Sequence, residues 1–160
     1  MRRYEMVRGA KYESTRHLDT AGVARLYRQE IKDAVKAGEL PAGLKTSVRI
    51  SRFAGGSDIR VEILAAPEVA ILNPERVVLN RAEPYAVHPE CHYPTHTEAG
   101  KKLLADLEAR LKSYGYDGSD TSSDYFNVRF YHSVSYAHDL LKREEDRIVA
   151  ENAALLSNAL

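Results

Sequence analysis

Apolar and polar residues alternate on both sides of the Gly55-Gly56 pair, over residues 46–65, and this pattern predicts a β-hairpin. A two-residue loop at the glycines predicts a type I′ turn, because both of its central positions need φ > 0. In that register Arg49 lies opposite Glu62. The apolar residues then share one face of the hairpin and the polar residues the other, and a slip by one residue would mix the two faces.

A helix is predicted over residues 20–37, because its apolar residues recur at helical spacing. Asp19 or Thr20 suits the N-cap position, and Gly38 follows the last turn, where a glycine commonly ends a helix. After the hairpin, residues 66–96 contain five prolines and predict an elaborated, irregular connection with at most one short helical turn or edge strand.

A second helix is predicted after Thr95, because its spacing to Glu98 fits a capping box, and it should end near Gly115. Residues 125–136 alternate again and predict a third strand. Residues 139–156 predict a last helix with a narrow apolar stripe, which would pack as a lid or against a second copy of the chain as a homodimer.

The order of the predicted elements is helix, strand, strand, irregular connection, helix, strand, helix. This order predicts an α+β fold of two layers, in which helices cover one face of a three-stranded antiparallel sheet. We expect residues 1–160 to form a single domain, with residues 1–18 as an N-terminal arm and residues 139–160 carrying the C-terminal helix.

Charge and cysteine content narrow the classes of function. The chain has 160 residues, of which 23 are basic and 23 acidic, so its formal net charge is +0 and a partner held by bulk electrostatics is not indicated. Cys91 is the only cysteine, which leaves no intrachain disulfide. No apolar run is long enough to span a bilayer, and we therefore expect an intracellular chain without a membrane partner.

Two segments together resemble a known domain family, namely SVRISRFAGGSDIRVEI in the predicted hairpin and YGYDGSDTSSDYFNVRFY before and within the third strand. The family is one of the "large polyvalent protein-associated" modules of phages and integrated mobile elements of bacteria. The resemblance covers about residues 19–65 and 101–131, and its most specific part is Tyr116–Asp120 with Asp124–Phe126. It implies an accessory protein of unassigned activity in the cytoplasm of a bacterial host, with no catalytic residues to transfer.

Polar residues on the three predicted strands form the first candidate site. By alternation, Arg49, Arg60, Arg129 and Tyr131 point away from the core. Three arginines could contact phosphates and the tyrosine could stack on a base, as in readers of single-stranded nucleic acid. The alternative is a solvated face on which Arg49 and Glu62 form an ordinary cross-strand pair.

A cluster of histidines and the cysteine forms the second candidate site, at His88, Cys91, His92 and His96. These residue types and spacings are used by zinc ligands, although a structural zinc site usually draws its ligands from separated elements. The alternatives are a surface loop with uncoordinated imidazoles and a Cys91 nucleophile assisted by a histidine. A zinc-binding module or a metal-dependent hydrolase is the corresponding function.

The segment from Asp117 to Asp124 is rich in Asp, Ser and Gly, and it predicts Asx turns rather than an EF-hand, whose ligand spacing it lacks. Motifs of nucleotide-binding loops, zinc proteases and serine hydrolases are also absent from the sequence. We therefore expect a protein that is not an enzyme and needs no cofactor. The expected activity is binding of a host or phage protein, or of nucleic acid, through the polar face of the sheet.

Overall fold

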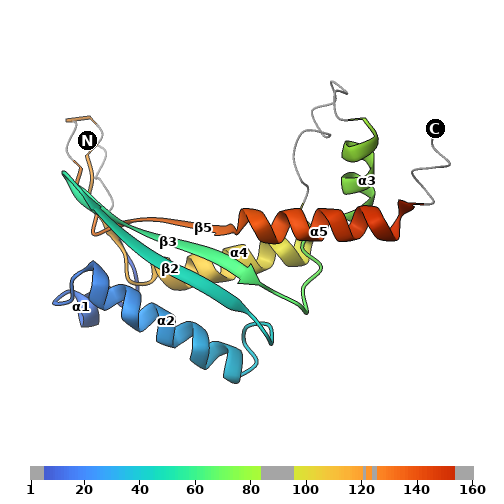
Figure 1. Cartoon of the computed structure of the whole chain (residues 1–160). Coiled ribbons are helices and arrows are strands. Elements are labelled where there is room, and N and C mark those ends of the chain that lie inside the picture. The colour runs from blue at the N-terminus through green and yellow to red at the C-terminus, as the bar shows by residue number, and fades with distance from the viewer. Residues whose placement is uncertain (1–5, 84–95, 121, 124–125, 154–160) are drawn as a thin grey trace.

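The computed structural model describes residues 6–83, 96–120, 122–123 and 126–153. They form a mixed α and β structure with five helices and two sheets among the described residues. In chain order the elements are β1 (Val7–Arg8), α1 (Tyr12–Thr15), α2 (Thr20–Lys36), β2 (Lys45–Phe53), β3 (Gly56–Ala65), α3 (Pro74–Ala82), α4 (Glu98–Lys112), β4 (Tyr116–Asp117), β5 (Tyr131–Tyr136) and α5 (His138–Glu151) (Figure 1).

The first helix is confirmed almost residue for residue. The Asp19 side chain caps α2 by accepting a hydrogen bond from the Gly22 amide at 2.9 Å. Gly38 follows the helix with φ 77, the left-handed conformation that ends many helices. Local signals at both ends therefore set the length of α2.

The hairpin of β2 and β3 is confirmed, but the predicted type I′ turn and its register are wrong. The loop is Ala54-Gly55, where Gly55 has φ 95, and Gly56 already lies in β3 opposite Phe53. The residue numbers of two paired positions therefore add up to 109, whereas they add up to 111 in the predicted register. Arg49 consequently lies opposite Arg60 instead of Glu62. Because the sum changes by two, each side chain stays on its predicted face while its partner changes.

The third strand is shorter than predicted and runs in the other direction. Strand β5 pairs with β3 in parallel, so the three-stranded sheet, in the order β2-β3-β5, is mixed rather than antiparallel. The connection from β3 to β5 contains α3 and α4, and a helical crossover of this kind is what joins parallel neighbours. Residues before β5 belong elsewhere: Val128 bridges to Asp117 of β4, and β4 pairs with β1 in a second, two-stranded sheet.

The predicted cap of the second long helix is also displaced. Thr97, and not Thr95, is the N-cap of α4, and its hydroxyl accepts a hydrogen bond from the Gly100 amide at 2.9 Å. Thr95 itself lies outside the described residues. The connection of residues 66–96 contains more order than predicted, because α3 is a nine-residue helix capped by Asn73.

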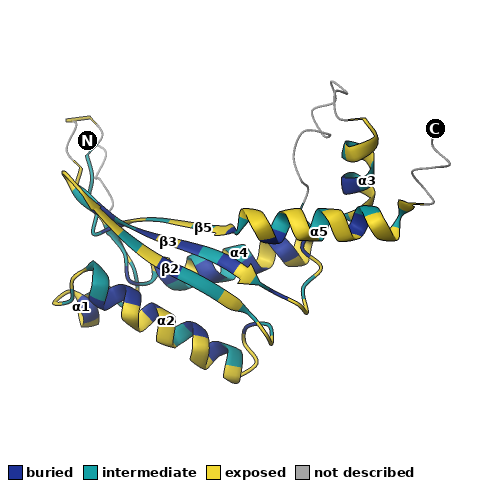
Figure 2. Ribbon diagram, viewed as in Figure 1, coloured by how far each residue is buried: buried dark blue, intermediate teal, exposed yellow. Residues whose placement is uncertain are grey.

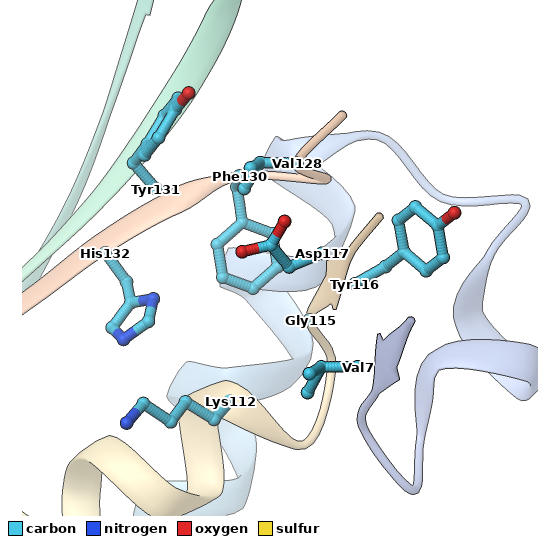
Figure 3. A pocket seen from close by; sticks show the side chains of 9 residues that line it. All are labelled: Val7, Lys112, Gly115, Tyr116, Asp117, Val128, Phe130, Tyr131 and His132. Carbon is cyan, nitrogen blue, oxygen red and sulfur yellow. The ribbon is translucent and has the colours of Figure 1, made fainter. Parts of the chain in front are cut away.

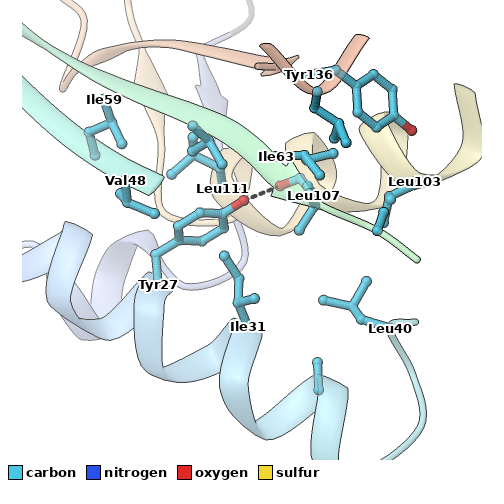
Figure 4. Close-up of a cluster of buried hydrophobic side chains, with 14 of the residues drawn as sticks. Tyr27, Ile31, Leu40, Val48, Ile59, Ile63, Leu103, Leu107, Leu111 and Tyr136 are labelled. Atoms are coloured by element: carbon cyan, nitrogen blue, oxygen red, sulfur yellow. Dashed lines mark hydrogen bonds between the residues drawn. The ribbon is translucent and has the colours of Figure 1, made fainter. Parts of the chain in front are cut away.

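The core lies between one face of the three-stranded sheet and helices α2 and α4 (Figures 1 and 4). Tyr27 of α2 is fully buried and donates a hydrogen bond to the Leu107 carbonyl oxygen of α4 at 2.9 Å, which ties the two helices together beneath the sheet. Figure 2 shows that the buried positions of these helices form stripes along their length, as an amphipathic helix requires.

Helix α5 continues directly from β5 and packs within the chain against α3 and β3. Leu140 and Ile148 of its apolar stripe are buried in the core, and Asp146 forms an ion pair with Arg81 of α3 at 3.4 Å. The described part of the chain therefore already covers these two stripe residues. The homodimer through this helix stays a prediction.

Candidate binding face of the sheet

The face of the three-stranded sheet that points away from α2 and α4 carries no buried residue, and we call it the open face. Its side chains alternate with the core positions along each strand. They are Ser47, Arg49, Ser51 and Phe53 of β2, Asp58, Arg60, Glu62 and Leu64 of β3, and Tyr131, Ser133 and Ser135 of β5. The predicted positions Arg49, Arg60 and Tyr131 are thus brought together on one surface.

Two aromatic rings, Phe53 and Tyr131, meet on the open face and form what we call the aromatic platform. Their ring centroids are 6.0 Å apart, and the residues are 50% and 41% exposed. Gly56 of the middle strand lies between them, since a Cβ atom there would stand 3.2 Å from the Phe53 ring and 3.3 Å from the Tyr131 ring. The absence of a side chain on Gly56 therefore allows rings from the two outer strands to approach each other.

The sequence interpretation missed Phe53. The signal was present, because the alternation that placed Arg49 and Ser51 on this face continues for two more residues to Phe53. Phe53 is the last residue of β2 and lies close to the predicted turn at Gly55-Gly56, so the prediction did not include it in the candidate site.

Arg49 and Arg60 lie directly opposite each other on β2 and β3, and both are exposed. Neither forms an ion pair with an acidic residue of the described ranges, whereas nearby Arg52 pairs with Asp19 at 3.2 Å. The open face therefore presents two exposed guanidinium groups to an anion, with Asp58 and Glu62 each two positions from Arg60 on β3.

Arg129 does not belong to the open face, so its predicted place there is wrong. Its guanidinium donates hydrogen bonds to the Tyr114 carbonyl oxygen at 2.7 Å, to the Thr15 hydroxyl at 2.9 Å, to the Leu18 carbonyl oxygen at 3.3 Å and to the Thr15 carbonyl oxygen. It also lies over the Tyr12 ring, 5.3 Å from the centroid. Burial lowers the pKa of Arg129.

Arg129 thus joins the end of α1 to the chain that follows α4. The carbonyl oxygens near a helix C-terminus lack intrahelical partners and attract positive charge. The prediction failed because alternation within residues 125–136 assumed one continuous strand, while the residues before β5 pair with β4.

Of the predicted metal ligands, His88, Cys91 and His92 lie outside the described residues. His96 is described, and its ring stacks on Tyr136 of β5 with centroids 5.3 Å apart. Its Nε2 atom is buried without a hydrogen-bond partner among the described residues, and burial followed by the charge of Lys101 lowers the pKa of His96. Within the described ranges no group of three or more His, Cys, Asp or Glu side chains is arranged to hold a metal ion. Zinc stays a prediction.

The Asx turns predicted after β4 are confirmed. The Asp117 carboxylate accepts a hydrogen bond from the Ser119 amide at 3.0 Å, and that of Asp120 accepts one from the Ser122 amide at 2.9 Å. The Asp and Ser residues of this segment therefore serve to stabilise the turns of its backbone.

Comparison of the chain with protein-family models, curated proteins and solved structures found no match. The resemblance to a phage-associated domain family therefore stays a prediction. Among the described helices, none has both the length and the apolar character needed to cross a bilayer.

Proposed function

We propose that this chain binds single-stranded nucleic acid on the open face, as a non-enzymatic accessory protein of a phage or phage-derived element in the bacterial cytoplasm. The observation that carries the proposal is the aromatic platform of Phe53 and Tyr131, on the same face as Arg49 and Arg60, which form no ion pair within the described residues. Proteins that bind single-stranded nucleic acid combine these two features, because aromatic rings stack on the bases and cationic side chains contact the phosphate backbone.

A single strand, rather than a duplex, suits this surface. Stacking requires a free base face, and the bases of a duplex present only their edges in the grooves. Each base stacked on an aromatic side chain stabilises a complex by about 1–3 kcal/mol. Phe53 and Tyr131 provide two such rings at one end of the sheet, and the arginine pair lies further along the same face.

Charge on the open face limits the expected affinity. Asp58 and Glu62 share the face with Arg49 and Arg60, so its formal charge is balanced. Two phosphate contacts to a single strand give a salt slope of about −1.4 in a plot of log affinity against log salt concentration. We expect modest affinity that rests on stacking more than on charge.

Fluorescence anisotropy with labelled single-stranded and double-stranded oligonucleotides, at two salt concentrations, tests the proposal. We expect Phe53→Ala and Tyr131→Ala each to weaken single-strand binding by about tenfold or more, as the loss of one stacked base implies. Phe126→Ala is the matched control, because Phe126 is 64% exposed and lies outside the open face.

The arginines are tested in the same titration. Arg49→Ala with Arg60→Ala should flatten the salt slope, because each lost phosphate contact removes about 0.7 from it. Arg25→Ala is the control, since Arg25 is exposed on α2 beneath the sheet. If the wild-type protein binds no oligonucleotide more tightly than about 10⁻⁴ M at low salt, the weak end of non-specific affinity, the proposal is wrong.

A protein partner is the second candidate, and the balanced charge of the open face favours it. Arginine and aromatic residues are enriched in protein interfaces, and Leu64 adds a third exposed apolar side chain, 41% exposed, to this surface. A pull-down from host lysate that captures one partner with the wild type, and loses it with Phe53→Ala but not with Phe126→Ala, would support this candidate.

A zinc-dependent role remains the enzyme alternative, and metal analysis of untagged protein with and without Cys91→Ser tests it.

A further inference from the structure

A pocket of about 350 Å³ adjoins the open face on the outer side of β5 (Figure 3). At this point the backbone passes from pairing with β4 to pairing with β3. The Arg129 amide donates a hydrogen bond to the Tyr116 carbonyl oxygen of β4 at 3.0 Å, and Tyr131, two residues later, pairs with β3. The separation of the two sheets at this point leaves the space. Its volume is within the range of small-molecule sites, about 300–1,000 Å³.

The walls of the pocket are mostly apolar, and a few polar groups stand among them. Val128 and Phe130 supply apolar surface, and Phe130 is 3% exposed and so fixed by the core. Lys112 and His132 line the pocket together, and both approach Glu108 Oε1, each at 3.4 Å. A few convergent polar groups in an apolar hollow are typical of a ligand site.

Tyr131 belongs both to this pocket and to the aromatic platform. A strand that stacks a base on the platform therefore carries its neighbouring nucleotide to the pocket. We propose that the pocket receives one nucleobase with an exocyclic amino group, which is cytosine, adenine or guanine but not thymine or uracil. This inference rests on the function proposed above and adds base preference to it.

Asp117 is the residue that would select the base. Its side chain is one of those that line the pocket (Figure 3). One of its carboxylate oxygens accepts a hydrogen bond from the Ser119 amide at 3.0 Å, and the other has no hydrogen-bond partner among the described residues. An ionised carboxylate only accepts hydrogen bonds, so it matches an amino group and repels the O4 carbonyl oxygen that thymine and uracil carry in place of the cytosine amino group. Lys112 and His132 would face the sugar and phosphate of the bound nucleotide, where their donors position it without reading sequence.

Asp117→Asn tests the selection, because asparagine keeps the side-chain oxygen that accepts the Ser119 amide and so preserves the turn. Anisotropy with oligo-dC and oligo-dT should show the wild type binding dC about fivefold more tightly, the lower end of the discrimination that a bidentate contact to a base provides, because only one Asp117 oxygen lacks a partner among the described residues. In Asp117→Asn the preference should vanish or reverse, because the amide can donate to the thymine carbonyl. Asp139→Asn, an exposed carboxylate on α5, is the matched control and should keep the preference.

Two further measurements separate this inference from the proposed function. Phe53→Ala should weaken dC and dT binding equally, because Phe53 is on the platform but not on the pocket. Titration of cytidine and uridine monophosphates, followed by NMR shifts of the His132 ring, probes the pocket without the platform, and we expect larger shifts and tighter binding for cytidine. Equal affinity for both monophosphates overturns the pocket proposal, even where oligonucleotides bind to the open face. Cytidine selectivity in a protein that binds no oligonucleotide supports the pocket and rejects the platform.

Discussion

Replacing Arg129 with alanine tests whether this arginine is a structural support rather than a ligand-binding residue. The change removes every donor that the guanidinium offers to the Tyr114 and Thr15 carbonyl oxygens, which lie near the ends of α4 and α1. It also removes the cation from above the Tyr12 ring. No other cation among the described residues donates to these two oxygens, so they lose charged partners at partly buried positions.

The expected loss of stability follows from the hydrogen bonds. A hydrogen bond to a charged group stabilises a fold by about 1.5–3 kcal/mol, and two carbonyl contacts at the lower end of that range give about 3 kcal/mol. For a chain of 160 residues this corresponds to a fall in melting temperature of about 6–12 °C. Arg129→Lys keeps the charge but not the planar fork, and it should recover less than half of the loss.

Urea unfolding followed by circular dichroism measures the change, with the slope of the transition showing whether unfolding stays two-state. Arg49→Ala is the control, because Arg49 is exposed on β2 without an ion pair in the described ranges, and its free energy of unfolding should stay within about 0.5 kcal/mol of the wild type. A loss below about 1 kcal/mol for Arg129→Ala, at an unchanged slope, would show that these hydrogen bonds do not hold the two helix ends together.

Three more substitutions or titrations test the fold. Gly55→Val should cost about 1–3 kcal/mol in urea unfolding, because Gly55 has φ 95 and a β-branched residue is strained there; an unchanged midpoint would contradict the loop at Ala54-Gly55. Burial raises the pKa of Tyr136 to about 12, so its contribution to the free energy of unfolding should be constant below pH 10, where the unfolded tyrosine begins to ionise, and should be lost as the pH rises towards 12; Tyr136→Phe should reduce that loss. Burial lowers the pKa of His96, so its contribution is complete above about pH 6.5 and is lost as the pH falls through the folded value. His96→Phe should therefore flatten the pH dependence of the urea midpoint between pH 7 and 5, and an identical profile in both proteins would show that His96 is not the group responsible.

Elements with local signals were predictable from the sequence. Asp19 and Gly38 mark the ends of α2 because capping depends on residues within a few positions of the helix terminus. The faces of the hairpin were also predicted correctly, because alternation assigns a side chain to a face without knowledge of its partner. The positions of Arg49 and Arg60 on the open face follow from this pattern alone.

Features that depend on distant segments were not predictable. Alternation gives neither the direction of a strand nor its neighbour, so the parallel pairing of β5 had no signal within residues 125–136. The role of Arg129 depends on where α1 and α4 end in space, which no local pattern encodes. The pocket likewise arises from the separation of two sheets, and its lining comes from three separate segments of the chain, at Val7, residues 112–117 and residues 128–132.

The parallel pairing of β5 with β3 has a consequence for the order of folding. Pairs across the β2–β3 hairpin join residues at most 20 positions apart, whereas Asp58 pairs with Tyr131 and Ile63 with Tyr136, each 73 positions apart. Long chain segments lose more entropy on closure and slow the formation of non-local contacts, so we expect the hairpin to form early and β5 to dock late. The ring of Phe53 then stands alone until the last strand brings Tyr131 beside it, and a nascent or partly folded chain carries only half of the surface that its completed form presents.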